Sequence, residues 1–293
     1  MKNYFLILAL CCAVAFVCCK KDEMEIIPQI PEDMEEAFPD PLFREYVLKN
    51  FDTNGDGRIS GKEALAITEI EVGNFDNRND ESKLIKSLEG IQYFSNLTDL
   101  DCSWNQLISL DVSKNTKLTV LDCYGNQLTT LDVSKNTKLE TLYFFQNHLT
   151  TLDVSKNTKL TKLSCYNNQL TTLNVSGCTH LTRLDCFRNR LTALDVSKNT
   201  QLEYLNCSYN QLTALDVSKN TQLTYLWCYE NQLTTLDVSK TNLGNSTWSY
   251  PLYCPSTLKT LYLKEGWSIR GITDDNGRSS DYIPEQTQII FVD

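Results

Sequence analysis

Histidine is scarce in this sequence, which contains only His148 and His180 among its 293 residues. Nucleophilic and acid–base catalysis needs such a side chain beside a nucleophile or a carboxylate. Cys178 lies two residues before His180, and we interpret this pair as neighbours in a turn. A glycine-rich loop of the phosphate-binding kind is also missing. We therefore expect a protein that is not an enzyme.

Basic residues are outnumbered by acidic residues. The chain has 27 Lys and Arg against 37 Asp and Glu, which leaves a net charge of −10. A protein of this charge repels phosphate backbones, so we expect no nucleic-acid partner.

Long apolar runs are missing everywhere except in the first twenty residues, which begin MKNYFLILALCCAVAFVCC. One lysine precedes about fifteen apolar residues here, fewer than the roughly 20 that a membrane-spanning helix needs. Such a run is typical of a secretory signal, which we place at residues 1–18. A membrane anchor helix is the alternative.

The signal ends in Cys18 and Cys19, and Lys, Asp and Glu follow. This ending resembles bacterial lipoprotein signals, whose cysteine becomes the lipidated N-terminus, and the residues after it resemble the export signal of surface lipoproteins in Bacteroidota-type bacteria. The resemblance implies lipidation at Cys19, with Cys18 as the alternative, and an outer-membrane anchor that exposes the protein at the cell surface. Residues 19–40 are rich in proline and acidic residues, so we expect a tether without a core.

An oxygen-rich segment, DTNGDGRISGKE, occupies residues 52–63. Calcium takes six to eight hard oxygen ligands, and this segment offers them at loop positions 1, 3, 5, 7, 9 and 12. The ligand residues are Asp52, Asn54, Asp56, Arg58 through its carbonyl group, Ser60 and Glu63. With Gly57 at the sharp turn, the segment resembles an EF-hand loop. We expect a structural Ca²⁺ site in an N-terminal cap at residues 41–66, with an acidic turn without metal as the alternative.

The main part of the chain repeats a 21-residue unit seven times between Leu97 and Leu233, and a fixed period of this length indicates a solenoid. Positions 1, 4 and 11 of each unit are leucine, position 9 is asparagine, and position 6 is cysteine in all units but one. Apolar residues alternate around positions 3 to 7, which predicts one short strand per unit with positions 4 and 6 inward. The second half of the unit, as in Leu131–Ser134, predicts an extended segment or a tight bend.

The unit resembles leucine-rich repeats, in particular the nested 21-residue kind called IRREKO, written LxxLxCxxNxLxxLDLxxNxx, with valine here in place of the last leucine. The resemblance implies a right-handed arch with a parallel β-sheet on its concave face and short extended or turn segments on its convex face. We assign residues 67–243 to these repeats and residues 244–293 to a degenerate last repeat and a β-type C-terminal cap. We expect the asparagine at position 9 to bond the backbone of the neighbouring coil.

Twelve cysteines would suggest disulfides in an exported protein. Six of them recur at position 6, on strands about 4.8 Å apart, whereas a disulfide needs Cβ atoms about 3.8 Å apart. We therefore expect these cysteines to be free thiols that fill the core. The pairing of Cys178 and Cys254 is left open.

Aromatic residues gather at positions 3, 5 and 7, which point outward from the expected concave sheet. Rigid aromatic surfaces with polar tips are common in binding sites. The candidate residues are Tyr124, Tyr143, Phe145, Tyr166, Phe187, Tyr204, Tyr225, Trp227 and Tyr229. We expect a cell-surface binding or adhesion module that recognises a protein partner, with a glycan as the alternative ligand. A third alternative is a purely structural cell-envelope protein, whose aromatic rows pack only on themselves.

Overall fold

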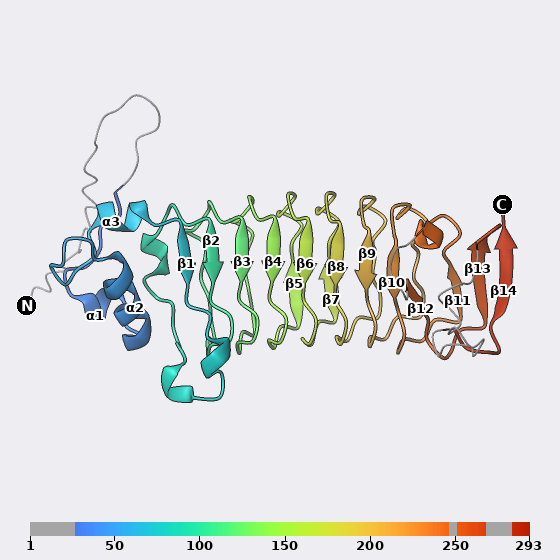
Figure 1. Cartoon of the computed structure of the whole chain (residues 1–293), viewed down its shortest axis with the longest axis horizontal. Helices are drawn as coiled ribbons and strands as arrows, with labels where there is room; N and C mark the ends of the chain where they lie inside the picture. The colour runs from blue at the N-terminus through green and yellow to red at the C-terminus, as the bar shows by residue number, and fades with distance from the viewer. Residues whose placement is uncertain (1–26, 246–250, 268–282) are drawn as a thin grey trace, which may run out of the picture.

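The computed structural model describes residues 27–245, 251–267 and 283–293, and it shows one long stack of β-coils with helices at its N-terminal end (Figure 1). The expected signal segment and Cys19 lie outside these residues. Within the described ranges, no helix has the length and apolar character needed to cross a membrane.

Nine parallel strands form the main sheet along the stack, in the order β1-β2-β3-β4-β6-β8-β9-β10-β12. Their bounds are β1 Glu69–Glu71, β2 Asp99–Asp101, β3 Val120–Asp122, β4 Thr141–Tyr143, β6 Lys162–Ser164, β8 Arg183–Asp185, β9 Tyr204–Asn206, β10 Tyr225–Trp227 and β12 Leu252–Tyr253. The strands of the seven full units occupy positions 3 to 5, and position 4 pairs with position 4 of the next coil, as in Leu100 with Leu121. This in-register stacking follows from the constant period and confirms the predicted leucine-rich-repeat solenoid.

The second half of each unit forms turns on the opposite side of the coil, as expected, and in three units it also contains a short strand. β5 (Thr151–Asp153) pairs with β7 (Thr172–Asn174) on this side. β11 (Thr235–Asp237) pairs with β13 (Thr260–Lys264), and β13 pairs with β14 (Gln288–Val292). β13 and β14 lie at the C-terminal end of the stack (Figure 1), where they form the predicted β-type cap.

The core is built from like residues stacked coil on coil. The leucines at positions 1, 4 and 11 and the residues at position 6 are at most 1% exposed in all seven units. A phenylalanine, Phe144, takes the cysteine position in the third unit and is also fully buried. The eight cysteines within the described ranges are free. The six at position 6 are free as expected for thiols that act as small apolar side chains, and Cys178 and Cys254, whose pairing was left open, are also free.

The asparagines at position 9 bond the backbone between coils, which confirms their expected role. Asn126 is representative. Its Nδ2 donates to the carbonyl groups of Cys102 (3.0 Å) and Cys123 (3.1 Å), and its Oδ1 accepts from the amide of Leu107 at 3.0 Å. One side chain therefore satisfies three buried backbone groups that neither a helix nor a hairpin would cover.

A second asparagine column, at position 19, was not anticipated from the sequence. Asn136 donates through Nδ2 to the carbonyl groups of Val112 and Asn115 in the preceding coil, both at 2.9 Å. Cys178 replaces asparagine in this column, and its thiol lies 3.4 Å from the carbonyl oxygen of Val154. Cys178 thus follows the same pattern with a weaker donor.

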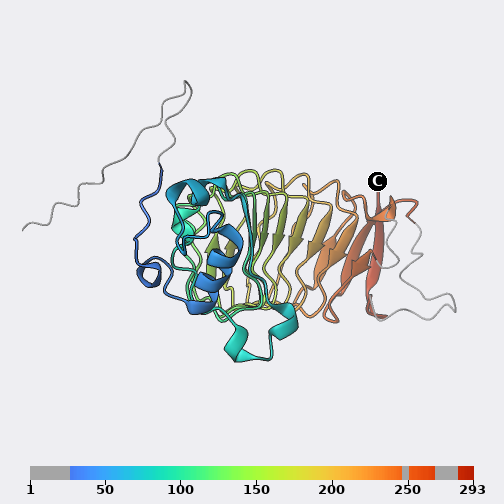
Figure 2. The same cartoon turned by 60° about the vertical axis from the view of Figure 1, so that its left-hand side comes forward.

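Three helices cover the N-terminal end of the stack: α1 (Met34–Ala37), α2 (Pro41–Phe51) and α3 (Gly61–Ala66) (Figure 2). Asp40 caps α2, because its Oδ1 accepts from the amides at the first turn of the helix. Phe43, Val47 and Phe51 form the buried side of α2. This arrangement covers apolar side chains that the first coil would otherwise expose.

The expected tether is too long at its C-terminal end. Phe38 is fully buried, with its ring centroid 5.8 Å from that of Phe43 and 5.9 Å from that of Phe94. Gly90 has a φ of 104° and approaches so closely that a Cβ atom there would lie 2.3 Å from the Phe38 ring. The N-terminal cap therefore begins near α1, within the segment assigned to the tether.

A longer connection between β1 and β2 was also missed. Thirty residues separate Glu69 from Asp99, which pair in register, so this coil is nine residues longer than the period of 21. The connection contains the 3₁₀ turns η1 (Phe75–Asn77), η2 (Glu81–Lys83) and η3 (Ile91–Tyr93). Its first part projects from the stack as the teal segment below β1 and β2 in Figure 1.

Candidate functional site

Four rings at position 7 stack face to face along the outward side of the main sheet, which we call the sheet face. Tyr124, Phe145, Tyr166 and Phe187 form this aromatic rail. Successive ring centroids are 4.1, 4.2 and 4.5 Å apart, and the interplanar angles are 12°, 11° and 17°. The spacing is close to the distance of about 4.8 Å between neighbouring strands, because each coil contributes one ring two residues after its strand.

The row is interrupted where serine takes position 7, and each time position 8 is aromatic, as in Ser103-Trp104 and Ser208-Tyr209. Position 8 has a left-handed backbone in all seven units, with φ of 53° at Trp104 and 51° at Tyr209. Trp104 packs edge-to-face on the first ring of the rail at 6.0 Å, and Tyr209 packs in the same way on Tyr229 at 5.2 Å. Position 8 therefore supplies a ring where position 7 has none.

Stacking determines which part of each ring a ligand meets. The faces of Phe145 and Tyr166 are covered by their neighbours on both sides, so these rings present their edges outward. An aromatic ring carries partial negative charge on its face and partial positive charge at its edge. Sugar stacking and cation–π contacts use the faces, whereas the edges favour oxygen acceptors and anions.

A second row lies along position 3. The guanidinium of Arg183 lies 3.7 Å from the centroid of the Tyr204 ring, and Tyr204 stacks on Tyr225 at 4.1 Å. Tyr225 also contacts Trp227, with ring centroids 4.9 Å apart. Tyr225 is only 5% exposed as a result, which leaves little of this candidate residue for contact with a partner. It packs between its neighbours and supports them.

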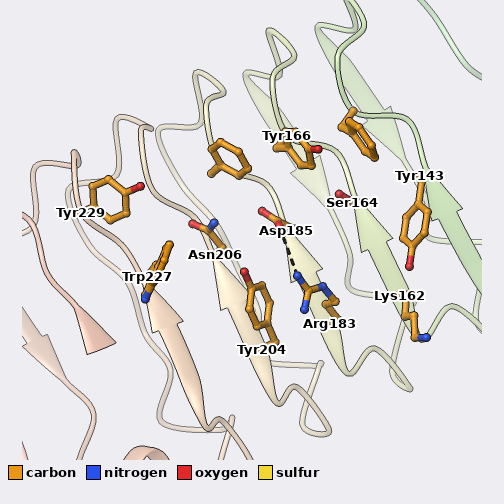
Figure 3. A pocket seen from close by; sticks show the side chains of 12 residues that line it. Tyr143, Lys162, Ser164, Tyr166, Arg183, Asp185, Tyr204, Asn206, Trp227 and Tyr229 are labelled. Atoms are coloured by element: carbon orange, nitrogen blue, oxygen red, sulfur yellow. Dashed lines mark ion pairs between the residues drawn. The ribbon is translucent and has the colours of Figure 1, made fainter. Parts of the chain in front are cut away.

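Between the two rows lies a hollow of about 750 Å³, which Figure 3 shows from close by. Its floor is formed by the position-5 residues Ser164, Asp185 and Asn206, which lie in one line across β6, β8 and β9. Aromatic residues at the same position, Tyr143 and Trp227, lie at its two ends. The hollow exists because three consecutive units have small or polar residues where their neighbours have rings.

Charged side chains line the hollow. Arg183 and Asp185 form an ion pair with an N–O distance of 3.8 Å (Figure 3). Burial raises the pKa of Asp185 to about 6, although the charge of Arg183 and the amide of Phe187 oppose this shift. Lys162 also lines the hollow and is exposed. The expected ligand surface is therefore more polar than its aromatic residues indicated.

The N-terminal end of the sheet face is strongly acidic. It carries five carboxylates on three adjacent strands: Glu69, Glu71, Asp99, Asp101 and Asp122. Glu71 lies opposite Asp101, and Asp101 lies opposite Asp122. Burial and the charges of Asp101 and Asp99 raise the pKa of Asp122 to about 6. The sheet face therefore changes from acidic at β1–β3 to aromatic at β9–β12.

Seven of the nine aromatic candidates line the hollow; Tyr124 and the buried Tyr225 do not. Sequence reasoning missed most of the charged and polar members of the same site, which are Lys162, Ser164, Arg183 and Asn206 beside Asp185. The signal that could have revealed them is the loss of aromatic residues at position 5 in three units between two units that retain them.

The expected calcium loop joins α2 to α3, and its carboxylates bond the loop itself. Asp52 accepts hydrogen bonds from the amides of Gly55, Asp56 and Gly57. Gly55 and Gly57 have φ values of 71° and 78°, which allows the loop to turn sharply. The amides that bond Asp52 draw the backbone around its carboxylate, so the loop is curved as a cation site requires.

Glu63 is held more tightly than a free ligand would be. Its Oε1 accepts from the amide and hydroxyl of Thr53 at 2.8 and 2.7 Å, and its Oε2 accepts from the amide and hydroxyl of Ser60, both at 2.8 Å. Burial opposes ionisation, but these bonds outweigh it and lower the pKa of Glu63 to about 2. In the described part of the chain, no group of three or more His, Cys, Asp or Glu side chains is arranged to hold a metal ion. The oxygen donors suit Ca²⁺, but Glu63 would have to exchange these hydrogen bonds for the metal.

Comparison with known proteins supports the repeat assignment. A family model described as leucine-rich repeats (2 copies) matches residues 158–199 and 200–245. The solved internalin C2 from Listeria monocytogenes is 19% identical, with 90% of this chain and 100% of that chain covered and a TM-score of 0.51. No curated protein matches the sequence.

A second solved structure shares more of the sequence. The functional domain of InlJ from Listeria monocytogenes, described as including a cysteine ladder, is 32% identical over 82% of this chain, with a TM-score of 0.46. This chain spans 58% of the length of that domain. The matched repeats and the parallel solenoid together show that this chain has the leucine-rich-repeat solenoid fold.

Proposed function

We propose that the chain is a non-catalytic binding module that recognises a segment of a protein partner across its sheet face. The observation that carries this proposal is the hollow of about 750 Å³, which is open on the sheet face and has charged, polar and aromatic walls. Binding sites combine such rigid aromatic area with a few placed polar groups. The extended surface of a repeat stack suits an extended ligand.

A protein ligand is favoured over a glycan by the orientation of the rings. The rail covers its own ring faces, which leaves edges where a sugar would need a face. Arg183 already occupies one face of Tyr204, and Tyr225 occupies the other. A peptide can instead use the edges, the charges and the hydrogen-bonding groups of the floor. Glycan binding is the second candidate and is an outcome of the experiment below.

Filling the hollow without removing any ring tests the proposal. Ser164 belongs to the floor, so Ser164→Arg would place a long side chain in the hollow. Thr172→Arg is the matched control, because Thr172 belongs to the same unit but is exposed on β7 at the other side of the coil. The purified variants would be compared in affinity capture from cell-surface extracts and on a glycan array.

We expect captured proteins to be lost with Ser164→Arg and retained with Thr172→Arg. Equal capture by both variants would show that the hollow is not the site. Glycan signals that disappear only with Ser164→Arg, without any such loss of protein, would favour the glycan alternative.

We also propose that a lipid on Cys19 anchors the module in the outer membrane and presents it at the cell surface. The support is the sequence of the N-terminal segment, in which an apolar run ends at Cys18 and Cys19. Labelling cells with a clickable palmitate analogue tests this proposal. Cys19→Ser should abolish labelling, and Cys18→Ser should retain it. Labelling that depends on Cys18 instead would move the cleavage site by one residue.

We propose, finally, that the loop at residues 52–63 binds one Ca²⁺ ion that stabilises the N-terminal cap. Asp52, Asn54, Asp56, Ser60 and Glu63 with the carbonyl group of Arg58 would hold the ion. The loop connects α2, which packs against the first coils, to α3, which leads into β1. A bound ion would therefore fix the cap to the stack, and its role would be structural.

A further inference from the structure

We infer that the hollow receives an acidic side chain of the protein partner, whose carboxylate lies beside Lys162 and Arg183. This inference rests on the proposed function, because it names the chemistry of the ligand at the same site. Both side chains line the hollow, and they lie opposite each other in register on β6 and β8. Figure 3 shows them along the same side of the floor.

The carboxylates in the described part of the chain do not neutralise both Lys162 and Arg183. Like charges directly opposite on neighbouring strands destabilise a sheet. Arg183 pairs with Asp185 at 3.8 Å, which is longer than a hydrogen bond and leaves guanidinium donors for a ligand. Within the described residues, no ion pair is formed by Lys162. An anion between them would satisfy both.

The position of Arg183 is fixed before any ligand arrives. Its guanidinium lies 3.7 Å from the Tyr204 ring centroid, and Tyr204 is held in turn by Tyr225 at 4.1 Å. A cation held in place loses little conformational freedom on binding, which favours a planar carboxylate that can meet the guanidinium with two hydrogen bonds.

The opposite wall of the hollow favours the same charge. Phe145 and Tyr166 line it and, with both faces covered, present ring edges, which carry partial positive charge. Asp185 is the one carboxylate among the residues of the lining. With Lys162 and Arg183 it leaves an excess of one positive charge, in a chain whose net charge is −10.

The remainder of the sheet face restricts where an anion can bind. The five carboxylates on β1–β3 repel a negative group and have no cation among the neighbouring positions 3 and 5. An acidic side chain on a ligand is therefore directed to β6 and β8. The acidic carboxylates on β1–β3 therefore only keep a negatively charged ligand group away from that end of the sheet face. We do not propose them as a binding site.

A pair of capped pentapeptides tests the inference. One has a single central glutamate flanked by serine and threonine, and the other has glutamine in its place. Each would be titrated to millimolar concentration against the folded protein and followed by ¹H–¹⁵N NMR. We expect the glutamate peptide to shift signals of β6, β8 and β9 and to bind about tenfold more tightly, because a charged hydrogen-bond pair adds about that factor.

Variants separate the charge from the shape of the site. Lys162→Gln should reduce the affinity for the glutamate peptide to that for the glutamine peptide. Lys156→Gln should have no effect, because Lys156 follows β5 on the other side of the coil. Arg183→Lys keeps a charge but removes the planar fork, so it should give an intermediate loss.

The outcomes distinguish this inference from the proposed function. Equal binding of both peptides at the hollow would overturn the acidic side chain but leave protein binding in place. No shift with either peptide at millimolar concentration would overturn the inference, and capture with Ser164→Arg would still test the proposed function separately. Tighter, Lys162-dependent binding of methyl glycosides of glucuronic or N-acetylneuraminic acid would assign the hollow to an anionic glycan and overturn the inference as stated.

Discussion

Phe145 and Tyr166 stack with ring centroids 4.2 Å apart and an angle of 11° between their planes. The two rings come from adjacent coils, just after β4 and β6, so their contact joins these coils outside the hydrophobic core. Tyr166 makes a second such contact with Phe187 at 4.5 Å. The rail therefore stabilises the stack as well as lining one wall of the hollow, and a loss of binding in a ring variant could reflect lost stability.

The stacked rings of the rail predict that two substitutions of Tyr166 change the free energy of unfolding by different amounts. Tyr166→Ala removes two stacked pairs, each of which contributes about 0.5–1.5 kcal/mol, so the free energy of unfolding should fall by about 2 kcal/mol. Tyr166→Phe keeps both pairs and should change it by less than about 0.5 kcal/mol. Denaturant unfolding followed by circular dichroism measures both values. Equal stability of the two variants would mean that the stacked rings contribute nothing to folding.

The asparagine at position 9 predicts a larger loss. Asn147 is 3% exposed, donates to the carbonyl groups of Cys123 and Phe144 at 3.0 Å, and accepts from the amide of Leu128 at 2.9 Å. Asn147→Ala leaves the buried amide of Leu128 without a partner, at about 1–3 kcal/mol. It also removes one of the two asparagine donors from each carbonyl group, since Asn126 still bonds Cys123 and Asn168 still bonds Phe144. The free energy of unfolding should therefore fall by about 3 kcal/mol.

The matched control for this variant is an exposed asparagine-to-alanine change, Asn50→Ala, in α2. Among the described residues, its exposed side chain bonds just the carbonyl group of Tyr46, so its effect should be below about 1 kcal/mol. Thermal and denaturant unfolding would rank the two variants. A loss at Asn147 no larger than that at Asn50 would contradict the assigned role.

The repeat made the architecture predictable, because a constant period forces like residues to stack in register. The inward leucines, the short strands and the role of Asn126 all follow from one unit. The hollow does not follow from one unit. Ser164 and Asn206 form its floor only because the units before and after them have aromatic rings at the same position. The stacking that buries Tyr225, and the burial of Phe38 beneath the cap, depend on packing between segments that the period does not describe.

Asp122 predicts a pH dependence of stability. Its pKa is raised from 3.8 to about 6 by burial and by Asp101 and Asp99, so the folded state binds a proton more tightly than the unfolded state does. The contribution of this proton is present below about pH 4 and is lost as the pH rises through 6. Asp122→Asn should therefore stabilise the protein at pH 7, by about 1 kcal/mol after allowance for screening of a partly exposed group.

Melting temperatures at several pH values measure this effect. The variant and the natural protein should converge as the pH falls below about 3, where Asp122 is protonated in both states. Asp185 has a similar pKa of about 6, so part of the pH dependence should persist in the variant. A variant that is less stable than the natural protein at pH 7 would show that the carboxylate makes a favourable contact instead.

The buried cysteines predict a large difference in thiol reactivity between the folded and unfolded protein. Burial raises the pKa of Cys165 and Cys186 well above the usual range, so the reactive thiolate is scarce. The eight cysteines of the described residues should resist a thiol reagent in the native state and react after unfolding in urea, without reduction. Fewer than half reacting after unfolding would indicate disulfides between coils.

Calcium should raise the melting temperature if the loop at residues 52–63 binds it. A ligand present at a hundred times its Kd adds about 2.7 kcal/mol, which corresponds to about 5 °C or more for a domain of this size. Calorimetry with excess calcium and with chelator measures the difference. Magnesium is the control, because its small octahedral shell fits a flexible oxygen loop poorly.

Glu63→Gln should abolish the rise, since Glu63 would close the calcium shell with both carboxylate oxygens. The variant will also be less stable without calcium, because Glu63 accepts charge-assisted bonds from Thr53 and Ser60. Each protein must therefore be compared with itself, with and without calcium. Asp56→Ala removes a second expected calcium ligand, which does not take part in capping α3. It should also reduce the calcium-dependent rise in melting temperature. An unchanged melting temperature of the natural protein in excess calcium would show that the Glu63 hydrogen bonds, which lower its pKa to about 2, are stronger than its attraction for the ion.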